Sequence, residues 1–321
     1  MSFLKNNKKK ILIILLIIVL LLILFGILFI IKVMLNLQEA EKESYQPIDH
    51  NRHQNIQIKS NQNMNNLSFL ILGLDKENEG TQRTDSIIVA TYNVDKNTIT
   101  MTRIPRDLYI EVDEYKGKIN ALYETKGLSA TINFIQDYTG IPITNYATTD
   151  FKGLTKMIDH VGGIDINSNI QIDDSNNSNL GGNIYINKGK NHLNGREALG
   201  YSRIRYIDND IERGNRQMDV INALIKKLTS TSQLATADSN IKYMSKYIKT
   251  DMKISTAIDY ALNLNSTPKM NKLTFTWDQF NNNGEDFVTI DDNERYKMSK
   301  ELRKNLDLKQ DTALLPIKTR P

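Results

Sequence analysis

The residues with the clearest chemical potential are arginines gathered in the stretch YSRIRYIDNDIERGNRQMD, residues 201–219. Arg203, Arg205, Arg213 and Arg216 all fall there. So many like charges in one short stretch repel one another unless negative groups lie among them. Guanidinium groups bind phosphate through two parallel hydrogen bonds and stay charged at physiological pH. The stretch therefore predicts a site for a defined phosphate-bearing anion.

The spacing of these arginines indicates how they could converge. Arg213, Arg216 and Gln217 are three and four residues apart, so they share one face at the start of a helix. Arg203 and Arg205 point the same way if their segment is extended. Basic residues at a helix start oppose the macrodipole, and a bound anion there would remove the conflict. The alternative is a solvated charged face whose arginines pair with nearby acidic residues, Asp208, Asp210 and Glu212.

Further arginines stand near the ends of predicted strands. Arg83 opens the stretch RTDSII, and Arg103 and Arg106 flank Pro105 in TRIPRDLYI. Proline fixes the backbone locally, so the two flanking side chains have defined directions. We expect these arginines to complete the anion site begun by residues 201–219. The alternative for this segment is a surface hairpin end held by a salt bridge to Asp107.

Two carboxylates accompany these arginines. Asp75 ends the apolar run LSFLILGLD, and Asp85 begins the next one. Loops at strand ends are where α/β sheets place their sites. Mg²⁺ favours one or two carboxylates together with water and phosphate oxygens, so the pair predicts Mg²⁺, with Mn²⁺ as the alternative metal. Either aspartate alone also fits an ordinary turn or cap. Arginines and carboxylates together predict a diphosphate bound with a divalent cation.

Other chemistry is excluded by what the sequence lacks. There is no cysteine, which removes thiol nucleophiles and thiolate metal sites. The four histidines are scattered and no HExxH occurs, so a zinc site is not expected. Neither a P-loop nor a dinucleotide-binding glycine pattern is present.

The N-terminal residues predict a membrane anchor. A lysine-rich tail, residues 1–10, precedes an apolar run over residues 11–31 that is long enough to cross a bilayer. The lysines before the run place the N-terminus in the cytoplasm and the rest of the chain outside the cell, in a single-pass topology. A cleaved signal peptide is the alternative, but the run is long and lacks a small-residue cleavage site. A polar linker, residues 32–66, leads to one extracellular domain, residues 67–321.

The charge balance argues against a nucleic-acid partner. The whole chain carries +4, but residues 1–32 contain five lysines and no acidic residue. Their removal leaves −1 for residues 33–321. A near-neutral outer domain has no general basic surface, so the arginine cluster is a local feature for a small anion.

Apolar runs and helical patterns alternate along the outer domain and predict an α/β fold with a mixed central sheet and helices on both faces. Asp150 is expected to cap the helix that follows it. The predicted strands are 67–75, 85–94, 99–104, 108–112, 143–150, 164–166, 183–189, 272–277 and 286–290. The predicted helices are 119–127, 128–140, 151–163, 196–202, 212–229, segments within 239–265, and 291–305.

A set of motifs between about residues 67 and 230 resembles the LytR–CpsA–Psr (LCP) family of bacterial cell-wall glycopolymer ligases. The motifs are FLILGLD, RTDSIIVATYN, ITMTRIPRDLYIEV, KINALYETKG, DFKGLTKMIDHVGGIDI, LNGREALGYSRIR and DIERGNRQ. The resemblance implies an α/β/α sandwich with a hydrophobic pocket for a polyprenyl chain. We expect the apolar faces of 128–140 and 150–161 to line that pocket, with ordinary core packing as the alternative.

The resemblance also assigns roles to individual residues. Asp75 and Asp85 match the aspartates linked to Mg²⁺, and with Arg83 and Arg106 they form the expected catalytic group. The matched phosphate-contacting positions are Arg83, Arg103, Arg106, Arg203, Arg205, Arg213 and Gln217, and Arg216 is a weaker match. The loop DKENEGTQRTD departs from the family pattern, in which many members carry a Gly before the Arg-Thr-Asp.

The activity implied by the resemblance is transfer of a glycopolymer, with wall teichoic acid favoured over capsule. The donor is a polyprenyl-diphosphate carrier and the acceptor is a muramic-acid hydroxyl of peptidoglycan. Mg²⁺ and arginines neutralise the diphosphate, and Asp75 or Asp85 is the expected base. The rival reading is a membrane-anchored protein that only binds such a glycan, or that attenuates envelope stress signalling. Hydrolysis of the diphosphate is a third reading. Residues after about 235 carry no readable motif.

Overall fold

The computed structural model describes residues 2–48, 65–75, 82–173, 184–204, 207, 209–234, 236–264, 266–310 and 313–320. The predicted features that lie outside these residues are Arg205, Asp208, most of the DKENEGTQRTD loop and residues 49–64 of the polar linker. Side chains are described from residue 18 onward, except in a few positions.

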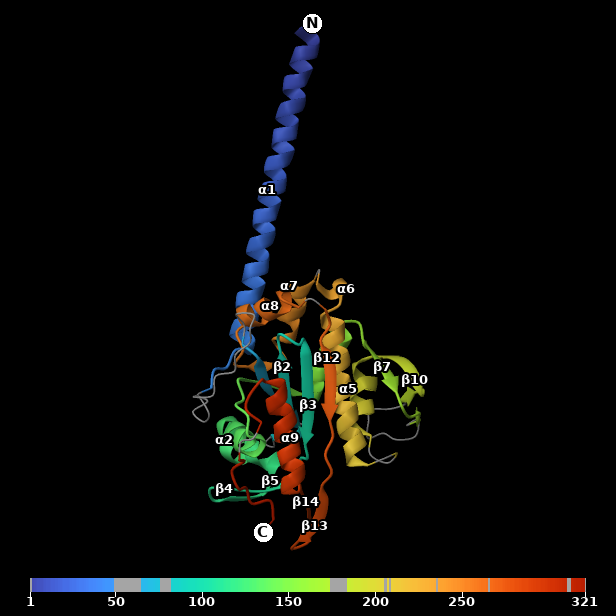
Figure 1. The fold of residues 1–321 in the computed structure, drawn as a ribbon. Helices are drawn as coiled ribbons and strands as arrows, with labels where there is room; N and C mark the ends of the chain where they lie inside the picture. Colours follow the sequence, from blue (N-terminus) through green and yellow to red (C-terminus); the bar gives the residue numbers. More distant parts are fainter. Residues whose placement is uncertain are drawn as a thin grey trace.

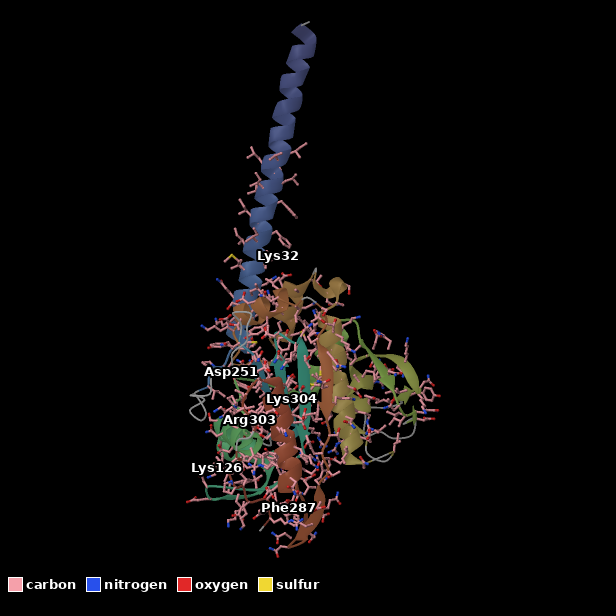
Figure 2. The ribbon with its side chains drawn as sticks, viewed as in Figure 1. Lys32, Lys126, Asp251, Phe287, Arg303 and Lys304 are labelled. Carbon is pink, nitrogen blue, oxygen red and sulfur yellow. The ribbon has the colours of Figure 1, made fainter. Side chains whose placement is uncertain are left out.

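The chain begins with one long helix, α1 (Ser2–Ser44), that projects from the domain (Figure 1). Its segment from Ile18 is long and apolar enough to cross a membrane. In Figure 2 the side chains of this segment stand outward around the helix, up to the label at Lys32. Phe25 is 70% exposed and Leu22 is 64% exposed, although both are large and apolar. Such a surface suits lipid rather than water, so α1 fits a transmembrane anchor.

The polar end of α1 is docked on the domain. Asn36 donates to the Asp238 carboxylate at 2.9 Å, and Lys242 lies 2.7 Å from Glu39. Both partners belong to α7 (Ala237–Met244). The backbone N–H of Gln46 then donates to the Thr250 carbonyl in β11 (Lys249–Thr250) at 2.7 Å. The described part of the predicted linker therefore lies against the folded domain.

The domain is built on a mixed sheet, as predicted. Among the described residues its six strands run in the order β11-β6-β1-β2-β3-β12. The strand β2 pairs antiparallel with both β1 and β3, whereas β6 joins β1, and β12 joins β3, in parallel. The bounds are β1 Leu67–Asp75, β2 Arg83–Asn93, β3 Thr98–Ile104, β6 Asn145–Asp150 and β12 Lys269–Leu273.

Helices cover both faces of this sheet (Figure 1). One face carries α2 (Leu122–Thr139) and α9 (Asp292–Asn305), whose side chains share the largest core with alternate strand residues such as Leu70 and Leu72. The other face carries α3 (Phe151–His160), α4 (Gly195–Arg203) and α5 (Asp210–Leu228). The two helices predicted over 119–140 are divided at Gly127, as predicted, because its φ of 83° breaks the helical backbone inside α2; the first of them starts with a 3₁₀ turn over 119–121.

Shorter elements complete the domain. The pairs are β4 (Tyr109–Val112) with β5 (Tyr115–Lys118), β7 (Ile164–Ser168) with β10 (Gly189–Leu193), β8 (Ile172–Asp173) with β9 (Tyr185–Ile186), and β13 (Asp278–Asn282) with β14 (Glu285–Thr289). The remaining elements are η1 (Ile119–Ala121), α6 (Thr231–Leu234) and α8 (Ile254–Leu262). The strand predicted over 272–277 is wrong in its bounds: β12 ends at Leu273, and Trp277 lies in the connection to β13.

Candidate functional site

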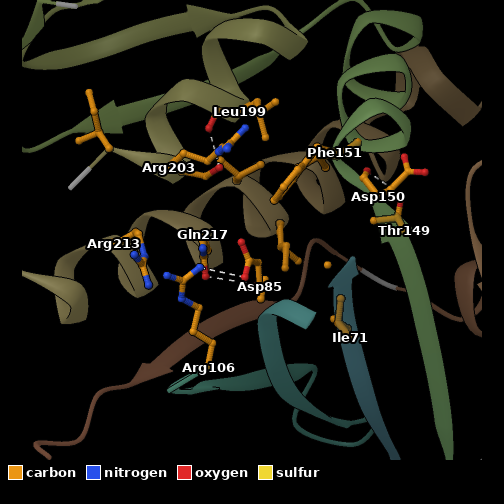
Figure 3. Close-up of a pocket in the computed structure, with 17 residues that line it drawn as sticks. Ile71, Asp85, Arg106, Thr149, Asp150, Phe151, Leu199, Arg203, Arg213 and Gln217 are labelled. Carbon is orange, nitrogen blue, oxygen red and sulfur yellow. Dashed lines mark hydrogen bonds and ion pairs between the residues drawn. The ribbon is translucent and has the colours of Figure 1, made fainter. Parts of the chain in front are cut away.

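A cavity of about 490 Å³ lies between the sheet and the helices α3, α4 and α5 (Figure 3). Its volume is within the range of small-molecule sites, about 300–1,000 Å³. The apolar part of its lining is Ile71, Phe151, Leu154, Leu199, Ile204, Val220 and Ile221. The polar part is Asp85, Ser86, Arg106, Thr149, Asp150, Ser202, Arg203, Arg213 and Gln217. The cavity therefore combines an apolar wall with a group of cationic and hydrogen-bonding side chains.

This location corrects one prediction. Residues 128–140 do not contribute to the lining of the cavity. Ile132, Ile135 and Tyr138 are buried in the core on the opposite face of the sheet, against α9. The other predicted segment, 150–161, does contribute, through Asp150, Phe151 and Leu154. An amphipathic pattern marks a buried face but does not say which side of the sheet that face covers.

A β-bulge aims Asp85 into the cavity. Gly73 pairs with Ser86 and Leu74 pairs with Thr84, so Asp85 is an extra residue in β2. Strict alternation would put Asp85 on the same face as Ile87, in the main core. The extra residue shifts the in-and-out alternation of side chains along β2, so Asp85 and Ser86 both line the cavity. Thr84 faces the opposite side of the sheet, where its hydroxyl donates to the Asn120 carbonyl.

Gly73 is part of the same β-bulge, opposite Ser86. A Cβ at this position would lie 3.0 Å from the Cβ of Ser86, closer than ordinary packing allows. The bulge thus brings two strands together at a point where one of them has no side chain.

Arg106 forms an ion pair with Asp85. Its Nη1 donates to Asp85 Oδ1 at 2.8 Å, and its Nε lies 3.5 Å from Asp107 Oδ2. Burial opposes the charged form of Arg106, but the carboxylates of Asp85 and Asp107 outweigh it, so the pKa of Arg106 is raised and the residue stays charged. In Figure 3 the two side chains meet in the middle of the site.

The start of α5 supplies two more polar residues, but not the third that the helical spacing predicted, because Arg216 bonds to α4 instead. Arg213 and Gln217 are one turn apart and both line the cavity. The hydroxyl of Ser86 donates to Gln217 Oε1 at 3.3 Å, which links the bulge to the helix. Arg203, at the end of α4, lies with its guanidinium 4.7 Å from the centre of the Phe151 ring. A cation over an aromatic face is favourable, and it places Arg203 at the border of the apolar wall.

Asp210 holds two of the predicted arginines. The side chains of Arg103 and Arg213 are 4% and 5% exposed, and both form ion pairs with this carboxylate. For Arg103 the distance from Nη1 to Asp210 Oδ2 is 2.6 Å. Burial by itself raises the pKa of the Asp210 carboxyl, but the two guanidinium groups outweigh burial and hold the pKa below its usual range. Arg103 does not line the cavity; it holds the carboxylate that positions Arg213.

Other predicted residues lie outside the cavity lining. Arg83 is at the open end of β2, where its side chain is 60% exposed and 4.0 Å from Glu124. Asp75 ends β1 directly opposite Arg83. Arg216 is 4% exposed and serves the scaffold: its guanidinium donates to the Tyr201 and Ile204 carbonyls at the end of α4, at 2.9 and 2.7 Å.

Some lining residues were not predicted, among them Ser86, Thr149 and Ser202. Thr149 stands at the junction of β6 and α3, beside Asp150 and Phe151 of the predicted segment. The predicted cap is confirmed, because Asp150 Oδ1 accepts from the Gly153 N–H at 2.7 Å. The site role of this junction could have been inferred from the strand pairing. Because β6 runs parallel to β1, both strands end at the same edge of the sheet, where α/β folds place their sites.

Asp75 and Asp85 are the carboxylates that could hold a Mg²⁺ ion, with substrate and water oxygens as its other ligands. Among the described residues, no group of three or more Asp, Glu, His or Cys side chains could hold a metal by itself. Asp75 alternates with the cavity-lining residues Ile71 and Gly73 along β1, so it belongs to the same sheet face as Asp85. One or two carboxylates with phosphate and water oxygens is the ligand set that Mg²⁺ prefers.

Comparison with known proteins places the chain in a family. Residues 31–304 match the model of the LytR_cpsA_psr family. The chain is 31% identical to the polyisoprenyl-teichoic acid–peptidoglycan teichoic acid transferase TagV of Bacillus subtilis, over 85% of this chain and 73% of that protein. It is 28% identical to TagU of Enterococcus faecalis, over 89% of this chain and 97% of that protein.

Solved structures agree with these matches. The crystal structure of B. subtilis TagV is 30% identical and superposes with a TM-score of 0.65, covering 76% of this chain and 98% of the other. This chain and B. subtilis TagV therefore share the α/β fold with a mixed central sheet. Because the family model covers most of the sequence, the chain belongs to the LytR_cpsA_psr family.

Proposed function

We propose that this protein transfers a teichoic-acid-type glycopolymer from a polyisoprenyl-diphosphate carrier to a muramic-acid hydroxyl of peptidoglycan. The relatives described above are named teichoic acid transferases, which supports a transferase activity. In this proposal α1 anchors the protein in the cell membrane with its N-terminus in the cytoplasm and the domain outside. Membrane, carrier-linked glycopolymer and peptidoglycan are the partners, and nucleic acid is not.

One observation carries the proposal: a single cavity joins an apolar wall to a group of arginines. A polyisoprenyl diphosphate has the same division, because an apolar chain is attached directly to two phosphates. The apolar chain suits the wall that includes Phe151 and Val220. The phosphates suit Arg106, Arg203 and Arg213, whose guanidinium groups can each bind two oxygens.

The ion pair between Asp85 and Arg106 suggests how the site receives the diphosphate. At 2.8 Å the two charges neutralise each other before substrate enters. A phosphate that takes Arg106 as its partner releases Asp85 for a cation. Mg²⁺ held by Asp75 and Asp85 would supply further neutralisation of the diphosphate charge.

The proposed reaction is an in-line displacement at phosphorus. The acceptor hydroxyl oxygen forms a bond to the glycan-bearing phosphorus, and the bond from that phosphorus to the bridging oxygen breaks. Polyisoprenyl phosphate leaves with the bridging oxygen, and the hydroxyl proton passes to a base, for which Asp75 or Asp85 remains our prediction. Catalysis of this type depends mainly on positioning and charge stabilisation, in which one arginine can contribute about 10³–10⁵-fold.

A transfer assay tests the proposal. The full chain in detergent would receive a short polyprenyl-diphosphate-linked teichoic precursor, peptidoglycan oligomers and Mg²⁺. We expect glycan covalently attached to the oligomer, with the rate lowered about 10³-fold in Arg106→Ala and Asp85→Ala. Arg320→Ala is a matched control, because Arg320 is 60% exposed and pairs with Asp278 near the C-terminus.

The assay also separates the proposal from its rivals. Tight binding of the precursor without transfer to any acceptor would support a binder or stress attenuator. Release of free glycan phosphate in the presence of acceptor would support hydrolysis. Unchanged transfer in Arg106→Ala would refute the site itself.

A further inference from the structure

A second cavity, which we call the Trp277 groove, adjoins the first one. It has a volume of about 180 Å³, and its lining is Pro105, Arg106, Asp107, Asn209, Asp210, Arg213, Trp277, Gln279 and Val288. Among the residues that the structure describes, the linings of the two cavities have only Arg106 and Arg213 in common. These two arginines therefore form the junction between an apolar cavity and a separate groove.

The Trp277 groove is built into the fold. Its walls come from the turn after β3, the start of α5, and the segment from Trp277 into the β13–β14 hairpin. The hairpin is fixed to the turn after β3, because the N–H of Val288 donates to the Asp107 carbonyl at 2.9 Å. The start of α5 is fixed by its cap, in which Asn209 Oδ1 accepts from the Glu212 N–H at 3.0 Å.

The chemistry of the groove differs from that of the apolar cavity. Its carboxylates already have cationic partners: Asp107 lies 3.5 Å from Arg106 and 3.3 Å from Lys118, and Asp210 holds Arg213. A second anion or cation would disturb this balance. A neutral ligand rich in hydroxyl groups would not, because the amide groups of Asn209 and Gln279 and the carboxylate oxygens can all bond to hydroxyls.

Trp277 adds an aromatic surface to these polar groups. Trp277 is partly buried, packs against the main core and is one of the residues that line the groove. A pyranose ring presents C–H groups on one face and hydroxyls around its edge. An aromatic ring beside amides and carboxylates therefore matches a sugar better than it matches a peptide or a lipid.

We infer that the Trp277 groove binds a sugar ring of the acceptor glycan. The inference rests on the proposed function. In an in-line displacement the attacking and leaving oxygens lie on opposite sides of the phosphorus. If the polyisoprenyl phosphate leaves into the apolar cavity, the attacking hydroxyl approaches across the arginine junction, from the side of the Trp277 groove.

The position of the groove in the molecule supports binding of the acceptor there rather than of the donor. Figure 1 shows β13 and β14 at the end of the domain opposite α1. Because α1 fits a membrane anchor, the groove faces away from the membrane surface. A polymer of the cell wall is met on that side, whereas the donor arrives from the membrane.

The chain offers a direct probe of this groove, because Trp277 is its only tryptophan. Intrinsic fluorescence of the full chain in detergent would be followed during addition of uncrosslinked peptidoglycan glycan oligosaccharides. We expect a saturable change. Gln279→Ala keeps the tryptophan and removes one exposed hydrogen-bonding group, so it should weaken binding several-fold. Dextran oligosaccharides of equal length are the control, and an equal response to them would overturn the assignment to the acceptor.

Steady-state kinetics give a second readout. Trp277→Ala should raise the KM for the acceptor about tenfold, since uncovering about 50 Å² of apolar surface changes a dissociation constant by roughly that factor. The KM for the donor should stay unchanged, and Trp277→Phe should restore part of the loss. A change confined to the donor KM, or fluorescence that responds only to glycan-bearing donor, would assign the groove to the donor glycan and overturn the inference.

The two experiments also separate the groove from the proposed function. The fluorescence titration needs no turnover, so acceptor binding without any transfer would refute the function and leave the groove standing. Transfer by the native chain with an unchanged acceptor KM in Trp277→Ala would refute the groove alone.

Discussion

Asp210 offers the sharpest test of how the arginines are held. Its carboxylate forms ion pairs with Arg103 and Arg213, and the side chains of those arginines are 4% and 5% exposed. Asp210→Asn keeps the shape of the side chain and removes its charge. Two guanidinium groups would then be buried without that counter-charge, which is the situation in which buried ions cost most.

The size of the effect follows from these exposures. Breaking a fully buried pair costs about 3–5 kcal/mol. The Asp210 side chain is 32% exposed, so water replaces part of the lost interaction, and we expect the free energy of unfolding to fall by about 2–3 kcal/mol. For a domain of this size that corresponds to a Tm lower by roughly 5–10 °C.

Calorimetry of the purified chain would measure this change, with Asp219→Asn as control. Asp219 is on the same helix and lies 2.7 Å from Lys272, but that lysine is 35% exposed. The control should therefore lose about 1 kcal/mol or less. Added pyrophosphate should raise the Tm of Asp210→Asn more than that of the native chain, because Arg213 lines the cavity and would accept a new counter-charge.

The pH dependence has a defined sign. The pKa of Asp210 is lower in the folded chain than its usual value, so its stabilising contribution is complete above the unfolded pKa of about 3.9 and is lost as pH falls through the folded pKa. The Tm difference between native chain and Asp210→Asn should be constant near neutrality and shrink only in strong acid. If the native chain and Asp210→Asn had the same Tm at pH 7, or gained the same Tm from pyrophosphate, the negative charge of Asp210 would not be what holds the two arginines.

Three other substitutions follow from the structure. Gly214→Ala places a Cβ 2.6 Å from Cδ of Arg103, whose side chain is 4% exposed and paired with Asp210. Although alanine favours a helix, the Tm should fall by the equivalent of about 1–2 kcal/mol, and a Tm at or above the native value would contradict this packing. Arg216→Lys loses the paired charged hydrogen bonds to the Tyr201 and Ile204 carbonyls, so urea unfolding should show a loss of about 2–4 kcal/mol; a native free energy of unfolding would contradict the scaffold role. Arg83→Ala should lower transfer less than tenfold, far less than Arg106→Ala, because Arg83 is 60% exposed outside the cavity; comparable losses in the transfer assay would restore Arg83 to the catalytic group.

The architecture was largely readable from the sequence because its signals are local. Continuous apolar runs predicted β1 and β2, and helical spacing predicted α5 with Arg213 and Gln217 on one face. The helix stop at Gly140 is confirmed by its left-handed backbone, with φ of 67°. These features depend on residues close together in the chain, so a single sequence suffices to find them.

The details of the site depend on pairing between distant residues, and they were not predicted. Residue type alone could not show that β2 carries a bulge at Asp85, because the bulge exists only in the register between β1 and β2. Nor could it show that Arg103 and Arg216 serve the scaffold. An arginine that binds a buried carboxylate or a helix end looks, in sequence, like one that binds phosphate.

The arrangement of the arginines gives these roles a common logic. The arginines that line the cavity come from the turn after β3, the end of α4 and the start of α5, three segments that nothing in the local sequence keeps together. Arg216 ties α4 to α5 through its bonds to the Ile204 and Tyr201 carbonyls, and Arg103 ties β3 to α5 through Asp210. Two buried arginines thus hold the three segments in place, and this frame brings the side chains of Arg106, Arg203 and Arg213 to one cavity.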